Sequence, residues 1–250
     1  MSTRTEQIFN FAFLDLETTG LPSEEHNRTR ITELNITVIE SKNISSGEYL
    51  RVRNKLNLCF NPEKLVQPKS TELTGLSNDI LENQSPFTLD VINTINHFLN
   101  LQKMPICLVA HYGDKFDYPI LKAEIMRSGG TLNENILCMD SLICFKDLHY
   151  KRPQEMCSSS ESISTEYSKT SEVCDEDIPV KKQKISFKLG EIYKRLTSKI
   201  PLDSHQAEAD VEYLIQCASV YGKYFVDWAN DNAKLFSTIP EMKPGKKIGC

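Results

Sequence analysis

The chain has 250 residues, of which 40% are hydrophobic and 25% charged, a composition typical of a globular protein that buries one sizeable core. The sequence contains no apolar run of 18 residues and no apolar segment near its start, which argues against a membrane-spanning helix and a secretory signal. The eight cysteines form no CxxC pair, and Cys59 and Cys107 lie inside apolar runs. Reduced core thiols rather than a zinc cluster are therefore predicted, in an intracellular protein of the nucleus, the cytoplasm or both.

The formal net charge of −5 is unevenly distributed along the chain. Residues 155–177 contain seven acidic side chains and a single lysine, so the remainder of the chain is close to neutral. A nearly neutral domain can still hold a phosphate backbone when metal ions and a few local bases take part, although its non-specific affinity is then modest. The charge balance therefore does not exclude nucleic acid as a binding partner.

The first third of the sequence predicts strands. An apolar run at 11–14 predicts a buried strand that ends at the Thr-Gly-Leu-Pro turn of 19–22. Apolar and polar residues then alternate over 34–38 and 56–60, which predicts two half-buried strands with a turn between them at 45–47. Three strands that follow one another in this way favour an antiparallel part of a sheet.

The rest of the chain alternates strands and helices. Short apolar segments at 106–110 and 136–139 predict two further strands. A short helix or turn is predicted at 71–76. Helical spacing or helix boundary signals then predict helices over 87–102, 116–127, 140–148, 187–196, 207–221 and 224–234. The predicted fold class is α/β, with a mixed five-stranded sheet, antiparallel and then parallel, flanked by helices.

Residues 151–184 differ from their surroundings, because they are rich in Ser, Thr, Glu and Asp and end in the basic cluster KKQK. Such a composition buries too little apolar surface to fold. A disordered surface insertion is therefore predicted within a single domain of residues 1–250. The basic cluster is interpreted as a solvated segment rather than an import signal.

Asp15 and Glu17 lie at the end of the first predicted strand. Residues two apart on a strand point to the same face, so both carboxylates project together from a mostly apolar element. Two like charges held so close repel each other unless a cation lies between them, and a divalent metal bound through oxygen is the usual solution.

Two later motifs supply further acidic side chains and an imidazole. In LVAHYGDKFDYPIL (108–121), Asp114 and Asp117 follow a buried strand, and Asp117 falls in the first turn of the next helix, where the helix dipole favours a carboxylate. In DSHQAEAD (203–210), Asp210 falls on a helix whose alanines allow close approach to the sheet, and His205 lies at the entrance to that helix.

The predicted metal ligands are Asp15, Glu17, Asp117 and Asp210, with Asp114 as the competing candidate for the place of Asp117. Four carboxylates are enough to bind two Mg²⁺ ions, and Mn²⁺ could substitute for Mg²⁺. Two such ions can clamp the attacking and leaving oxygens of a phosphodiester. His205 can accept the proton of the attacking water, because imidazole exchanges protons near neutral pH. No serine or cysteine has the sequence setting of a covalent nucleophile, so direct hydrolysis is predicted.

The three motifs are similar to those of a known family. DLETTGLP (15–22), HYGDKFD (111–117) and the H-x-A-x-x-D of 205–210 resemble the exonuclease motifs of the DnaQ-like DEDDh class. They resemble more closely those of the three-prime repair exonuclease family, as do LTGLS, LVAH, SFKLGEIYKRL and LFSTIPEM. The resemblance covers essentially the whole chain except 151–184.

This resemblance implies an RNase H-like fold and metal-dependent removal of nucleotides from DNA 3′ ends, usually by a homodimer. Matched position by position, the metal ligands are Asp15, Glu17, Asp117 and Asp210, and the general base is His205. Leu21, Pro22 and Leu73 match positions that pack against the terminal nucleotide. The other positions matched to substrate contacts are Glu17, Lys115, Phe116 and Ser186. The strand near 50–60 is the expected dimer edge.

The chain also departs from the family. Tyr112 stands where the family usually has Asn, which changes the hydrogen bonding expected near Asp117. The proline-rich loop and membrane-anchoring extension of one vertebrate branch are absent, so neither SH3- or WW-type partners nor membrane tethering is expected.

Three functions follow from the sequence. The first is a 3′–5′ exodeoxyribonuclease acting on single-stranded or frayed DNA ends. The second is a 3′–5′ exoribonuclease of the same fold, since discrimination depends on contacts to the sugar 2′ position. The third is an inactive nucleic-acid-binding module, which would be expected to lack a carboxylate or the histidine, whereas all five side chains are present.

Overall fold

The structure is a computed structural model that describes residues 6–47, 51, 53–151, 185–202, 204–246 and 248. The predicted insertion at 151–184 lies outside the described residues except for Lys151, which ends a helix.

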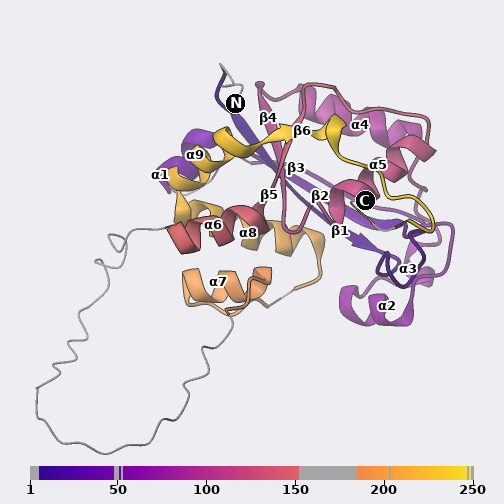
Figure 1. The fold of residues 1–250 in the computed structure, drawn as a ribbon. Coiled ribbons are helices and arrows are strands. Elements are labelled where there is room, and N and C mark those ends of the chain that lie inside the picture. Colours follow the sequence, from indigo (N-terminus) through magenta and orange to yellow (C-terminus); the bar gives the residue numbers. More distant parts are fainter. Residues whose placement is uncertain are drawn as a thin grey trace, which may run out of the picture.

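A six-stranded sheet forms the centre of the described chain (Figure 1). From one edge to the other its strands are β3 (Asn54–Cys59), β2 (Ile31–Glu40), β1 (Asn10–Thr18), β4 (Ile106–Ala110), β5 (Leu137–Asp140) and β6 (Lys234–Leu235). Strands β1 to β3 are antiparallel, β4 and β5 run parallel to β1, and β6 is antiparallel to β5. The predicted mixed sheet is confirmed, and the two-residue β6 adds a sixth strand.

Helices cover both faces of this sheet (Figure 1). In chain order they are α1 (Ser41–Ser46), α2 (Pro68–Thr74), α3 (Asn78–Leu81), α4 (Leu89–Asn100), α5 (Asp117–Arg127), α6 (Ser141–Lys151), α7 (Leu189–Thr197), α8 (Ala207–Tyr221) and α9 (Lys223–Asn232), followed by a 3₁₀ turn at Phe236–Thr238. The helices predicted at 87–102, 116–127, 187–196 and 207–221 are confirmed within a few residues. The sequence predicts only a turn at 45–47, whereas the structure forms helix α1 there. Gly47, with a φ of 67°, ends this helix.

The alternation of side chains along β1 divides the core into two layers. Leu14 and Leu16 point to the face covered by α4 and α5, whereas Phe11 and Phe13 point to the face covered by α8 and α9. Residues two apart on a strand share a face, so the next odd-numbered residues of β1 continue toward α8. The strand therefore delivers two carboxylates to the same side as the start of that helix.

Within the described ranges, no helix is both long enough and apolar enough to cross a membrane. Five cysteines of this part of the chain are free thiols, and all of them except Cys59 are buried. The prediction of a core thiol therefore holds for Cys107, whereas Cys59 is only partly buried.

Candidate active site

Asp15 and Glu17 open into a pocket of about 320 Å³ at the carboxyl end of β1. The pocket is bounded on one side by the loop that contains Leu21 and by helix α2, and on the other by the segment that leads into α8. Both carboxylates are partly buried, and the apolar neighbours of Asp15 on β1 are fully buried. The predicted pairing of the two acids on one strand face is therefore present.

Helix α8 and the segment that leads into it bring Asp210 and His205 to this pocket. Asp210 lies in the first turn of the helix, and its Oδ2 accepts a hydrogen bond of 2.8 Å from the backbone N–H of His205. His205 adopts a left-handed backbone conformation with a φ of 68°, which is uncommon for a residue with a side chain and is often found at functional sites. One ligand atom from each of Glu17, His205 and Asp210 lies within 4.8 Å of the others.

Asp117 is the first residue of α5 and is only 2% exposed. Its Oδ1 is buried without a hydrogen-bond partner among the described residues. Asp114, the competing candidate, also has a buried Oδ1 without a partner among these residues, but its Oδ2 forms an ion pair of 2.7 Å with Lys234 of β6. Asp117, unlike Asp114, is among the charges that raise the pKa of Asp15, so it is the candidate of the second motif for this site.

The electrostatics of the site show that negative charges are crowded together there. Burial raises the pKa of Asp15 well above its usual value, and the charges of Asp117, Glu17, Asp210 and Glu33 raise it further. Burial and the charges of Asp210, Glu33 and Asp117 raise the pKa of Glu17 to about 8. Burial, together with the charge of Asp140, raises the pKa of Asp117 to about 8, and burial also raises that of Asp210.

These properties fit a hard divalent cation. The donors are carboxylate oxygens with one imidazole beside them, which suits Mg²⁺ or Mn²⁺ better than a soft metal. A cation among the acids would stabilise their charged forms, which burial and mutual repulsion disfavour. It would also give the unpaired oxygen of Asp117 a partner. Asp15, Glu17, Asp117 and Asp210 are the residues that would hold it.

Glu33 is a fifth carboxylate that sequence reasoning missed. It pairs directly with Glu17 in the register of β1 and β2, and cross-strand partners point to the same face. Its Oε2 accepts a hydrogen bond of 3.1 Å from the backbone N–H of Ala207, the first residue of α8. Glu33 therefore fastens the start of the helix that contains Asp210 to the strand next to Glu17. The only signal in the sequence is an acid in ITELNITVI, a stretch in which the other polar residues are uncharged.

We expect Glu33→Ala to lower kcat by about 10–100-fold, the usual effect of losing a residue that orients metal ligands. Glu33→Gln keeps an oxygen that can accept the Ala207 N–H, so its activity should stay close to that of the wild type. Initial rates measured across a Mg²⁺ titration compare the two variants. An equal loss in both would show that the charge of Glu33, rather than its hydrogen bond, is what matters.

Asp140 is a second positioning residue that the sequence did not reveal. This buried residue ends β5, and its carboxylate accepts hydrogen bonds from the backbone N–H groups of Tyr112 (3.1 Å), Asp114 (3.2 Å) and Leu142 (2.9 Å). It thereby holds the loop that leads into Asp117. Tyr112 has a φ of 66°, a left-handed conformation that Asn adopts more readily than Tyr, so the Asn expected here from the resemblance would suit this backbone better.

The structure brings only some of the predicted substrate residues to the carboxylates. Leu21, Leu73 and Phe116 line the same pocket, and the two leucines are 47% and 48% exposed. Pro22 and Lys115 line an adjacent hollow that also includes Leu21 and Phe116. Ser186 lies in neither hollow, but in a third one with His111 and Phe187. Ser186, predicted as a substrate contact, therefore lies outside the pocket that contains the carboxylates.

Residues 12–218 match the family described as Exonuclease (RNase_T). The fold also resembles E. coli exonuclease I in a zinc-bound complex with single-stranded DNA, with 16% identity and a TM-score of 0.61. That match covers 88% of this chain and 42% of the exonuclease I chain, so this chain spans less than half of that protein's length. At this identity the likeness concerns the fold alone, and it agrees with the predicted RNase H-like architecture. The chain belongs to the exonuclease family.

Curated relatives narrow the assignment within this family. The chain is 33% identical to three-prime repair exonuclease 1 of Bos taurus, over 92% of this chain and 69% of the relative. It is 34% identical to the Homo sapiens protein of that name, over the same shares of the two chains, and 31% identical to Homo sapiens three prime repair exonuclease 2, over 93% of this chain and 92% of the relative. The resemblance to three-prime repair exonucleases is confirmed, and with it the class of 3′–5′ exonucleases.

Proposed function

We propose that this chain removes nucleotides one at a time from the 3′ ends of single-stranded or frayed DNA by metal-dependent phosphodiester hydrolysis. The observation that best supports this proposal is the meeting of Asp15, Glu17, Asp117 and Asp210 with His205 at the carboxyl end of β1. The four acids come from three separate elements, β1, α5 and α8, and burial in this site raises the pKa values of all four.

Two Mg²⁺ ions, or Mn²⁺ in their place, would be held by the four acids and would supply activation of water and neutralisation of phosphate charge. His205 lies within ligand distance of Glu17 and Asp210 and is exposed to the pocket, so it can accept the proton of the attacking water. The hydrogen bond from its backbone to Asp210 fixes the position of this base relative to that acid.

The apolar rim of the pocket suits the end of a strand. Leu21 and Leu73 are half-exposed although they are apolar, and Phe116 lies beside them. Apolar and aromatic side chains can pack on any base, because every base has a π-face. Such packing favours ends that are already unpaired, so frayed or single-stranded 3′ ends are the proposed substrates.

We further propose that the chain forms a homodimer through β3. This strand is at the edge of the sheet, and its outer backbone groups are available for pairing. Light scattering at micromolar concentration should give twice the mass of one chain. A single-chain mass at that concentration would rule this dimer out without affecting the proposed chemistry.

A substrate comparison tests the proposed activity. Single-stranded DNA and RNA of one sequence, each labelled at the 5′ end, are incubated with Mg²⁺ and sampled over time. We expect a ladder that shortens from the 3′ end for DNA and little change for RNA. Faster shortening of RNA would assign the chain to exoribonucleases, and binding without any shortening would make it an inactive binding module.

A further inference from the structure

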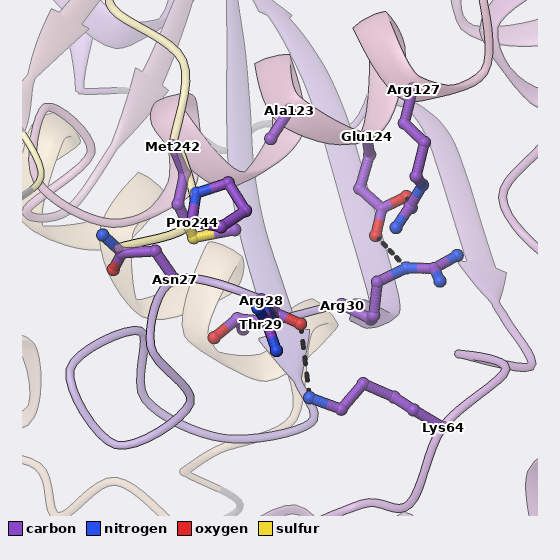
Figure 2. Close-up of a pocket in the computed structure, with 10 residues that line it drawn as sticks. All are labelled: Asn27, Arg28, Thr29, Arg30, Lys64, Ala123, Glu124, Arg127, Met242 and Pro244. Atoms are coloured by element: carbon purple, nitrogen blue, oxygen red, sulfur yellow. Dashed lines mark hydrogen bonds and ion pairs between the residues drawn. The ribbon is translucent and has the colours of Figure 1, made fainter. Parts of the chain in front are cut away.

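A second pocket, of about 570 Å³, lies between the loop before β2 and helix α5 (Figure 2). We call it the basic pocket, because four cationic side chains line it: Arg28, Arg30, Lys64 and Arg127. Met242, Pro244 and Ala123 add an apolar wall. None of these residues belongs to the active site described above.

The acids around the basic pocket do not fully neutralise its cations. Glu124, which is 2% exposed, accepts a hydrogen bond of 2.8 Å from Nε of Arg30 and also forms an ion pair with Arg127 (Figure 2). Lys64 forms an ion pair with the buried Glu25, and Arg30 forms a second one with the exposed Glu63. Three carboxylates thus face four cations.

The positive charge that these carboxylates do not neutralise lies at Arg28 and around Arg127. Arg28 is exposed and forms no ion pair within the described part of the chain. Burial and the charge of Arg30 lower the pKa of Arg127 to about 10, so these two guanidinium groups repel each other. An anion placed in the pocket would relieve this repulsion. Guanidinium forks match the oxygens of a phosphate group particularly well.

The basic pocket is connected to the active site through one further hollow. That hollow shares Leu21 and Phe116 with the active-site pocket and Asn27 with the basic pocket. It also contains Lys115 and Lys246, so positive charge continues between the two ends. The three hollows follow one another along the loop of residues 20–30.

We propose that the basic pocket binds a backbone phosphate of the same nucleic-acid strand whose 3′ end occupies the active site. This rests on the proposed function, because it assumes that a strand enters the active-site pocket. The pocket then contributes affinity for long substrates without touching the bond that is cut. An interaction that is equally strong before and during the reaction changes KM and leaves kcat unaltered.

The test uses Arg28→Glu with Lys42→Glu as the matched charge reversal. Lys42 lies on α1, away from all three hollows. Binding of fluorescent oligothymidylates of roughly 4 and roughly 24 nucleotides is measured by anisotropy in EDTA, so that no hydrolysis is needed. We expect Arg28→Glu to weaken binding of the longer strand about tenfold and to leave binding of the short strand unchanged. The slope of log affinity against log salt concentration for the longer strand should fall by about one, because one fewer counterion is released. Lys42→Glu should bind both strands like the wild type, and kcat should be the same in all three proteins.

Three results would overturn the proposal. One is an equal loss for the short and long strands, and another is no loss for either. The third is displacement of the long strand by thymidine 5′-monophosphate from the wild type but not from Arg28→Glu, which would assign the pocket to a free nucleotide. Length-dependent binding that needs Arg28, in a protein that does not cut DNA, would support the pocket while refuting the proposed activity.

Discussion

Asp117→Asn should lower the rate of 3′ end hydrolysis by at least about a thousandfold, because changes to groups that only orient metal ligands already cost about 10–100-fold. The side chain is buried at the start of α5, and one of its oxygens has no partner within the described chain. An amide keeps the shape but removes the charge that a cation needs. The rate is measured on 5′-labelled single-stranded DNA under saturating Mg²⁺.

Asp114→Asn is the matched control for this prediction. It makes the same chemical change three residues earlier, in the loop that leads into α5, where the acid forms an ion pair with Lys234. A partly exposed pair contributes little to stability, so this variant should keep nearly full activity. If Asp114→Asn inactivated the enzyme and Asp117→Asn did not, the assignment of the second motif would be wrong.

The second large effect concerns stability in the absence of metal. Glu17 and Asp117 have folded-state pKa values raised to about 8, whereas in the unfolded chain they titrate near 4. The folded protein therefore holds more protons than the unfolded chain between these values. Its free energy of unfolding must fall as the pH rises through this window, since deprotonation places uncompensated charges in a buried site. We expect the metal-free protein to melt at a clearly lower temperature near pH 8 than near pH 5.

Calorimetry of EDTA-treated protein, with and without added Mg²⁺, measures this effect. Mg²⁺ should raise the melting temperature strongly near pH 8 and little near pH 5, because a ligand that binds only the folded state stabilises it by mass action. Asp117→Asn removes one buried charge, so the metal-free variant should melt roughly 5 °C or more above the metal-free wild type near pH 8. A wild type that is equally stable at both pH values without metal would show that the acids are not crowded.

The sequence predicted the central sheet because its strands have strong local signals. The apolar run at Phe11–Leu14 and the alternation at Leu34–Val38 each report a buried face directly. Strand β6 has only two residues, and it exists because Leu235 and Lys234 pair with β5. A strand that short carries no periodicity, so only its tertiary partner defines it.

The same distinction applies to the site. Asp15 and Glu17 are predictable because the two-residue period of a strand places them on one face, and motif resemblance supplied Asp117, Asp210 and His205. Glu33 and Asp140 act through bonds to backbone N–H groups far away in sequence. Such a role depends on strand register and on where α8 begins, which no local pattern encodes.

The most direct test of the central claim is a calorimetric titration of Mn²⁺ into the protein at neutral pH, with thymidine 5′-monophosphate present to supply phosphate oxygens. If the four acids form one metal centre, the wild type should bind two ions per chain, and Asp117→Asn and Asp210→Asn should each bind fewer ions or bind them far more weakly. Absence of saturable binding in the wild type, or identical titrations for all three proteins, would contradict the account.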